Sequence, residues 1–195
     1  TALGFDPVNT PIPEAAIKGD KKEVYSQDLN NDGLTDIIIA NRLGTLQTDI
    51  YLNRGDAKFS KIVHNLPTPP ITSALNFVDV NSDGFIDVII TDKSGSNSWN
   101  INNKKINLSG ALFNVVPPIP NQDLKDTKEF HFIEYNGDSR LDFFIVDIVT
   151  GAHVFYENQS DANNLVKFQK KNVNLGISAA DLKNNILVPV DLDND

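Results

Sequence analysis

The chain has 195 residues, a formal net charge of −9 and 40% hydrophobic residues, which is typical of a folded globular protein and not of a disordered one. A negatively charged chain repels a phosphate backbone, and paired basic residues such as Lys104-Lys105 are isolated, so we do not expect nucleic acid as a partner. The absence of Cys excludes disulfides and thiolate metal sites. No apolar run approaches the ~18 residues of a membrane-spanning helix, so we expect no membrane insertion.

Short runs of β-branched and aromatic residues, separated by Gly, Asn, Asp and Pro, predict strands along most of the chain. After a lead-in at 1–20, the expected strands cover residues 23–27, 36–40, 48–52 and 59–64, then 73–78, 87–91, 97–102 and part of 105–116, then 128–135, 142–147, 153–157 and 166–170. The connections at 67–70 and 117–126 contain Pro, which cannot donate to a sheet ladder. Only residues 178–183 suggest a single helical turn.

One acidic loop recurs between the first and second strand of each group. It reads DLNNDGLTD at 28–36, DVNSDGFID at 79–87 and EYNGDSRLD at 134–142, and the chain ends inside a fourth copy, DLDND, at 191–195. Four strands in a repeat of roughly fifty residues predict an all-β protein made of β-propeller blades, each a four-stranded antiparallel sheet. A stand-alone β-sandwich is the alternative.

The repeat divides the chain into units. The expected units are 1–20 as a lead-in or the end of a preceding blade, 21–68, 69–124 and 125–180 as three blades, and 181–195 as the truncated start of a fourth. Because a propeller closes with about four to eight blades, we expect a covalent part of a longer chain with six to eight blades.

The spacing of oxygen-bearing side chains in these loops predicts calcium sites. Calcium takes six to eight oxygen ligands, and positions 1, 3, 5, 7 (by its backbone carbonyl) and 9 of such a loop converge on one point. The expected ligands are Asp28, Asn30, Asp32, Leu34 and Asp36; Asp79, Asn81, Asp83, Phe85 and Asp87; Glu134, Asn136, Asp138, Arg140 and Asp142; and Asp191, Asp193 and Asp195.

The four loops are not equivalent. The first two are complete, with Gly33 and Gly84 at the sixth position, where a sharp turn is needed. The third is degraded, because Glu134 replaces Asp and Ser139 replaces Gly, and the fourth is incomplete. The alternative is that these are metal-free Asn-Asp-Gly hairpin turns, since such residues are common turn formers.

These loops differ from an EF-hand, in which position 12 is Glu; here position 12 is Ile39 or Ile90. Instead they have an acid at position 9, and a strand follows it directly. The pattern resembles the FG-GAP or VCBS repeats of integrin-alpha-like β-propellers. The segment from Ile50 through Asn53 and Gly55 to Phe59 resembles the later strand and turn of that family. The resemblance implies a propeller whose calcium, bound on hairpins within each blade, is mainly structural.

We expect no catalytic activity. No nucleophile elbow or phosphate-binding loop occurs, and His64, His131 and His153 lie in or beside expected strands without a catalytic signature. Trp99 is expected to pack between blades, with sugar stacking as the alternative. Arg54-Gly55-Asp56 matches a tripeptide that many integrins recognise, but it falls in the turn that the repeat requires.

The sequence therefore predicts a calcium-binding, non-catalytic propeller segment that acts as a protein-interaction or adhesion scaffold. The alternatives are a carbohydrate-binding lectin propeller and an accessory domain of a polysaccharide-active enzyme or toxin. The partner is thus a protein or a glycan. Loops of this kind fill at millimolar calcium, so we expect a secreted or cell-surface location.

Overall fold

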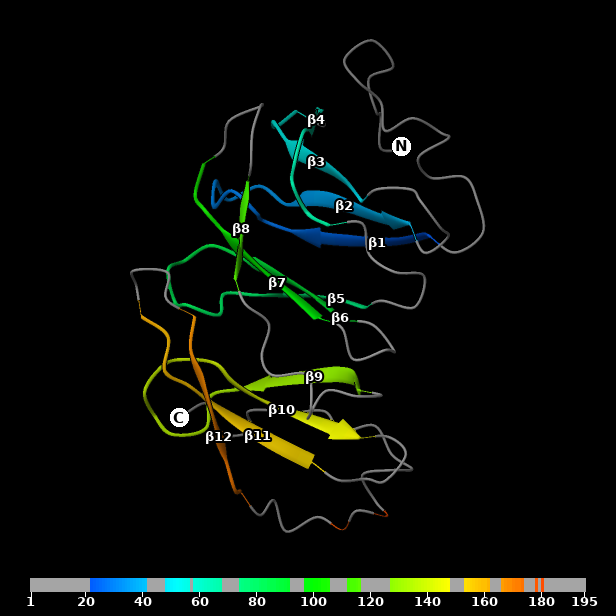
Figure 1. Cartoon of the computed structure of the whole chain (residues 1–195). Coiled ribbons are helices and arrows are strands. Elements are labelled where there is room, and N and C mark those ends of the chain that lie inside the picture. The colour runs from blue at the N-terminus through cyan, green and yellow to red at the C-terminus, as the bar shows by residue number, and fades with distance from the viewer. Residues whose placement is uncertain are drawn as a thin grey trace.

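The computed structural model describes residues 22–41, 48–56, 58–67, 74–91, 97–105, 112–116, 127–147, 153–161, 166–173, 178 and 180. These residues form three separate four-stranded antiparallel sheets (Figure 1). The lead-in at 1–20, the start of the fourth repeat at 181–195 and almost all of the expected helical turn lie outside the described residues.

Each sheet is one repeat, and its strands pair in chain order. The first sheet contains β1 (Lys22–Gln27), β2 (Asp36–Asn41), β3 (Asp49–Asn53) and β4 (Phe59–Ile62). The second contains β5 (Ala74–Val78), β6 (Asp87–Thr91), β7 (Asn97–Asn102) and β8 (Phe113–Val116). The third contains β9 (Thr127–Ile133), β10 (Asp142–Asp147), β11 (His153–Asn158) and β12 (Phe168–Lys171).

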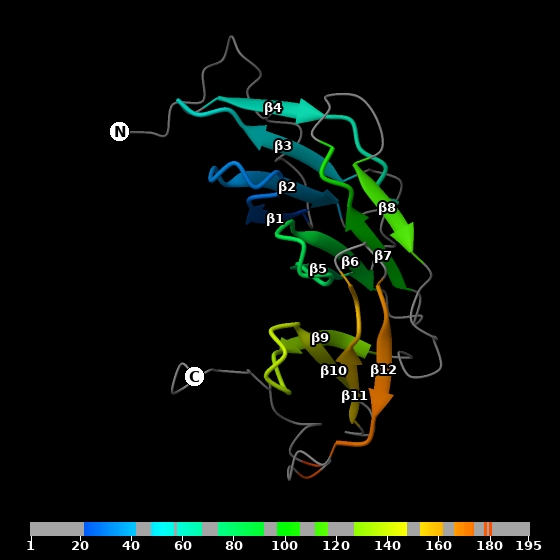
Figure 2. The same cartoon turned by 90° about the vertical axis from the view of Figure 1, so that its left-hand side faces the viewer.

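The all-β blade architecture expected from the sequence is confirmed, including a last strand of the second blade within 105–116. In Figures 1 and 2 the second blade lies between the other two, with β5 and β9 on one side of the molecule and β8 and β12 on the other. No helix among the residues described is long and apolar enough to cross a membrane.

The blades bury their faces against one another because alternate residues of a strand point to opposite faces of its sheet. In β6, Val88 and Ile90 belong to an apolar cluster shared with the first blade, whereas Ile89 belongs to a cluster shared with the third. All three side chains are almost completely buried. The middle blade is thus covered on both faces, which explains its continuous apolar run, Val88-Ile89-Ile90.

Trp99 of β7 is the centre of the contact between the second and third blades. Its side chain has no exposed surface, and its ring lies 5.9, 5.6 and 5.2 Å from the rings of Phe130, Phe143 and Phe168 in the third blade. The expectation that Trp99 packs between blades is confirmed. A fully buried ring cannot stack on a sugar, so that alternative is wrong for this residue.

Candidate metal centre

The first two acidic loops have the same backbone shape. Each connects the first and second strands of its blade, and each has left-handed φ angles at its fourth and sixth positions, 55° and 83° at Asn31 and Gly33 and 55° and 85° at Ser82 and Gly84. Gly at the sixth position meets the expected need for a sharp turn. The left-handed conformation at the fourth position was not anticipated from the sequence, although Asn, which occupies it in the first loop, tolerates this conformation better than most residues.

The third loop has the same left-handed positions with the residue types exchanged. Gly137 at position 4 has φ 76°, and Ser139 at position 6 has φ 64°. Ser139, which replaces Gly at the sixth position, therefore has a left-handed backbone, which costs a non-glycine residue about 1 kcal/mol or more.

Side-chain oxygens at the first and fifth positions fold onto the loop backbone. Asp28 accepts hydrogen bonds from the N–H groups of Asp32 and Gly33 at 3.2 and 2.8 Å, and Asp32 accepts one from Leu34 N–H at 2.8 Å. In the second loop, Asp79 accepts bonds from Asp83 N–H and Gly84 N–H at 3.0 and 2.8 Å. The carboxylates of each loop are thereby held near its concave backbone.

The ninth-position aspartate is fully buried in each loop and connects three segments. Asp36 has no exposed surface, and its two oxygens accept Leu29 N–H at 2.9 Å and Asn53 N–H at 2.8 Å. It therefore joins the second residue of its loop to the end of β3. Sequence reasoning assigned this position to the metal alone and missed its bonds across the blade.

The same arrangement recurs in the other two blades. Asp87 accepts Val80 N–H at 3.0 Å and Asn102 N–H at 2.8 Å. Asp142 accepts the N–H groups at positions 135 and 158 at 3.2 and 2.7 Å. Because all three copies agree, the buried aspartate is a property of the repeat.

Burial makes these aspartates costly to ionise. The pKa of Asp36 is raised to about 6 and that of Asp87 to about 7, and burial is the largest cause. The two backbone hydrogen bonds to each carboxylate act in the opposite direction, and the other carboxylates of the loop add to the effect of burial. The pKa of Asp142 is also raised, mainly by burial. A cation close to these carboxylates would favour their charged forms.

In two of the loops a basic side chain lies beside the fifth-position carboxylate; Lys104 comes from the segment after β7 and Arg140 from the third loop itself. Lys104 Nζ lies 3.2 Å from Asp83 Oδ2, and Arg140 forms an ion pair with Asp138 of the third loop. Glu134 of the third loop also folds back, accepting N–H groups from Asn136, Gly137 and Asp138. The third loop thus neutralises part of its own charge.

The donor set fits calcium in its chemistry, because the first two loops present carboxylate, amide and carbonyl oxygens with no nitrogen or sulfur ligand. Within the part of the chain that the structure describes, no three Asp, Glu or His side chains gather closely enough to hold a metal ion as they stand. Calcium would require these side chains to move closer together, and the first- and fifth-position carboxylates could keep their bonds to the loop amides, because each carboxylate oxygen has a second lone pair. Residues Asp191, Asp193 and Asp195 lie outside the described residues.

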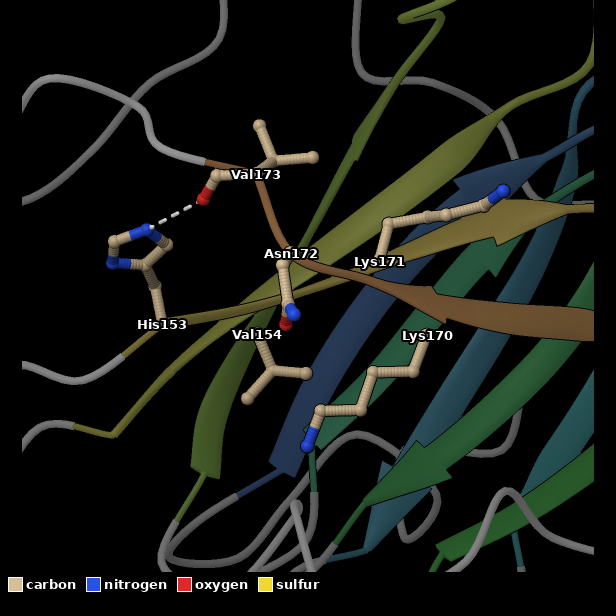
Figure 3. A pocket seen from close by; sticks show the side chains of 6 residues that line it. All are labelled: His153, Val154, Lys170, Lys171, Asn172 and Val173. Atoms are coloured by element: carbon tan, nitrogen blue, oxygen red, sulfur yellow. Dashed lines mark hydrogen bonds between the residues drawn. The ribbon is translucent and has the colours of Figure 1, made fainter.

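The three histidines are not brought together. His64 follows β4, donates from Nε2 to Thr48 O at 2.6 Å and accepts Leu66 N–H at Nδ1. His131 in β9 stacks on Phe144. His153 lines a shallow pocket with Val154, Lys170, Lys171, Asn172 and Val173, and its Nε2 lies 3.3 Å from Val173 O (Figure 3). None of the described residues that line this pocket carries a carboxylate or hydroxyl group.

Arg54-Gly55-Asp56 lies in the turn between β3 and β4, as expected. Arg54 N–H donates to Lys58 O at 2.8 Å, Lys58 N–H donates to Gly55 O at 3.0 Å, and the side chains of Arg54 and Asp56 are exposed. Asn158-Gln-Ser160 matches the Asn-x-Ser pattern of glycosylation sites. Asn158 is fully buried and donates to backbone carbonyls, so it is not accessible for modification in the folded blade.

The fold and the loops define a protein made of propeller-type β-blades, each with an acidic hairpin loop. The sequence profile of the FG-GAP-like repeat matches residues 28–90, from the first acidic loop almost to the end of β6. Residues 28–90 are therefore similar to an FG-GAP-like repeat, as the loops indicated. A sequence search among curated proteins finds no match.

Proposed function

We propose that the chain is a calcium-binding, non-catalytic propeller segment that serves as a protein-interaction or adhesion scaffold in a larger secreted or surface protein. One observation carries the calcium proposal. Two loops in different blades have the same oxygen donors, the same left-handed positions and a buried aspartate whose ionisation is unfavourable without a cation.

The role of calcium in this proposal is to stabilise the blades. Each loop joins β1 to β2 or β5 to β6, and its ninth residue also holds the end of the third strand. A cation that fixes the loop would therefore stabilise most of the sheet. A ligand at about 100 times its Kd stabilises the folded state by about 2.7 kcal/mol.

Thermal unfolding in calcium chloride and in chelator tests the proposal. For a chain of this size, about 2.7 kcal/mol corresponds to an increase in Tm of roughly 5–10 °C. Magnesium should have a smaller effect, because it keeps its waters and needs octahedral geometry. The matched control is the double variant Asp32→Asn and Asp83→Asn, in which the calcium-dependent increase should largely disappear. Equal Tm values in calcium and chelator would refute calcium binding.

The positions of the histidines and of Trp99 support a scaffold role over catalysis or sugar binding. The histidines occupy separate positions in two blades, and Trp99 is enclosed between blades, which removes the main sugar-stacking candidate. A protein partner is therefore favoured over a glycan. Binding to a glycan array would refute this preference, and unchanged cell attachment by Arg54→Ala would exclude the exposed tripeptide as the adhesive element.

A further inference from the structure

An asparagine at the end of the third strand connects the acidic loops of neighbouring blades. Asn102 ends β7 in the second blade, and its side-chain Nδ2 donates to Leu29 O of the first loop at 2.7 Å, across 73 residues of sequence. Its backbone N–H donates to Asp87 of the second loop at 2.8 Å. One residue thus contacts the loops of two blades.

The connection continues within the first loop. Leu29, whose carbonyl accepts the bond from Asn102, donates its own N–H to Asp36 at 2.9 Å. A series of hydrogen bonds therefore runs from Asp36 through Leu29 and Asn102 to Asp87. Its members are almost fully buried, with Leu29 and Asn102 each 1% exposed, so these bonds have little competition from water.

The third blade repeats the arrangement. Asn158 Nδ2 donates to Val80 O at 2.7 Å across 78 residues, and Asn158 N–H donates to Asp142 at 2.7 Å. Val80 N–H in turn donates to Asp87. We call the continuous series Asp36, Leu29, Asn102, Asp87, Val80, Asn158 and Asp142 the inter-blade relay.

The first two loops also lie close together. A methyl group placed on Gly84 would lie 3.6 Å from Asn31 Nδ2 of the first loop. The turn of one loop and the turn of the next are therefore neighbours, and a change of shape in one is felt by the other.

We propose that Asn102 and Asn158 are positioning residues that couple the metal loops of adjacent blades, so that calcium in one loop strengthens calcium binding in the next. This inference rests on the proposed function. Calcium bound by Asp36 would fix the carboxylate that accepts Leu29 N–H, and thereby the position of Leu29 O. Because Leu29 O accepts the bond from Asn102, and Asn102 N–H donates to Asp87, the same event positions an expected ligand of the second loop.

Asn53 provides a matched control for Asn102. Its Nδ2 donates to Thr35 O at 3.0 Å and its Oδ1 accepts Gly55 N–H at 3.0 Å. Asn102 makes the two equivalent bonds within its own blade, with Ile86 O at 3.2 Å and Lys104 N–H at 3.0 Å. Among the described residues only Asn102 of this pair adds a bond to another blade, so comparing Asn53→Ala with Asn102→Ala isolates that bond.

The experiment is a calcium titration followed by NMR at two backbone amides, Gly33 for the first loop and Gly84 for the second. Asp32→Asn disables the first loop at an exposed position, and Asp83→Asn disables the second. Coupling energies between sites usually correspond to a factor of about five or more in affinity. We expect Asp32→Asn to weaken calcium binding at the Gly84 amide about fivefold, and Asp83→Asn to weaken it at the Gly33 amide by the same factor, because coupling is reciprocal.

The asparagine variants then identify the path. In the Asn102→Ala background, Asp32→Asn should leave calcium affinity at Gly84 unchanged, whereas in the Asn53→Ala background the fivefold effect should remain. Equal loss of coupling in both backgrounds would overturn the relay. If Asn102→Ala does not fold, the reciprocal effects of Asp32→Asn and Asp83→Asn still decide whether coupling exists.

The two proposals fail in different ways. If both amides respond to calcium but neither loop variant affects the other loop, the relay is wrong and calcium binding stands. If neither amide responds to calcium, the proposed function is wrong and the relay falls with it.

Discussion

Lys104 places a positive charge beside a carboxylate that the proposed calcium site of the second loop would use. Its Nζ lies 3.2 Å from Asp83 Oδ2 and 5.6 Å from the centre of the Phe85 ring. The Asp83 side chain is 1% exposed, while that of Lys104 is 40% exposed. Calcium in the second loop needs the Asp83 carboxylate, so it must displace this ammonium group. We predict opposite effects of Lys104→Gln on calcium affinity and on metal-free stability.

The size of the effect follows from the geometry. At 3.2 Å and an effective dielectric constant of about 20, the direct attraction is about 5 kcal/mol. Desolvation and side-chain ordering cancel most of it, and exposed pairs retain about 0.2–1 kcal/mol. Because Lys104 is partly exposed, we take the net value as about 1 kcal/mol or less. Removing the competitor should therefore raise calcium affinity in the second loop up to about fivefold.

The assay combines two measurements. Calcium titration followed at the Gly84 amide gives the affinity, and urea unfolding in chelator gives the metal-free free energy of unfolding, which should fall by up to about 1 kcal/mol. Lys105→Gln removes the same charge one residue further along and is the matched control. An unchanged or lower calcium affinity for Lys104→Gln, relative to Lys105→Gln, would refute the reasoning.

Three further predictions concern other residues. Burial lowers the pKa of His64 below its usual 6.5, so the unfolded chain binds this proton at a higher pH than the folded chain does. The free energy of unfolding should therefore fall as pH decreases below about 6.5. In urea unfolding, His64→Gln should lose less stability than the unchanged chain between pH 8 and pH 5.5, and an equal loss would contradict the argument. Trp99→Ala removes a large buried ring between two blades and should lower the free energy of unfolding by about 3–5 kcal/mol, measured by circular dichroism; Trp99→Phe should lower it less. A cost below about 1 kcal/mol for Trp99→Ala would show that this interface contributes little to stability. Arg140→Gln should release Asp138 and raise calcium affinity at the third loop, measured at the Gly137 amide, whereas unchanged affinity would indicate that Glu134 or Ser139 limits that site.

The strands and loops could be predicted because their causes are local. Apolar runs such as Val88-Ile89-Ile90 next to an Asp-Gly turn predict a hairpin from a few residues, and β6 begins at Asp87 as expected. The repeated donor spacing likewise identified the acidic loops. The role of Asn53, Asn102 and Asn158 was missed, although an asparagine ends the third strand of every blade, because a recurring polar residue in the sequence does not reveal which distant carbonyl it binds.

The sequence by itself determined the hairpins, the blade repeat and the oxygen-rich loops, since each depends on residues within one turn or one pair of strands. Only the tertiary structure decided how the loops are connected. The bonds from Asn102 to Leu29 and from Asn158 to Val80 join residues 73 and 78 positions apart, and the Trp99 cluster draws its partners from another blade. Such contacts exist only after the blades have packed, because packing brings a buried donor and a buried carbonyl into range and removes the water that would otherwise satisfy them.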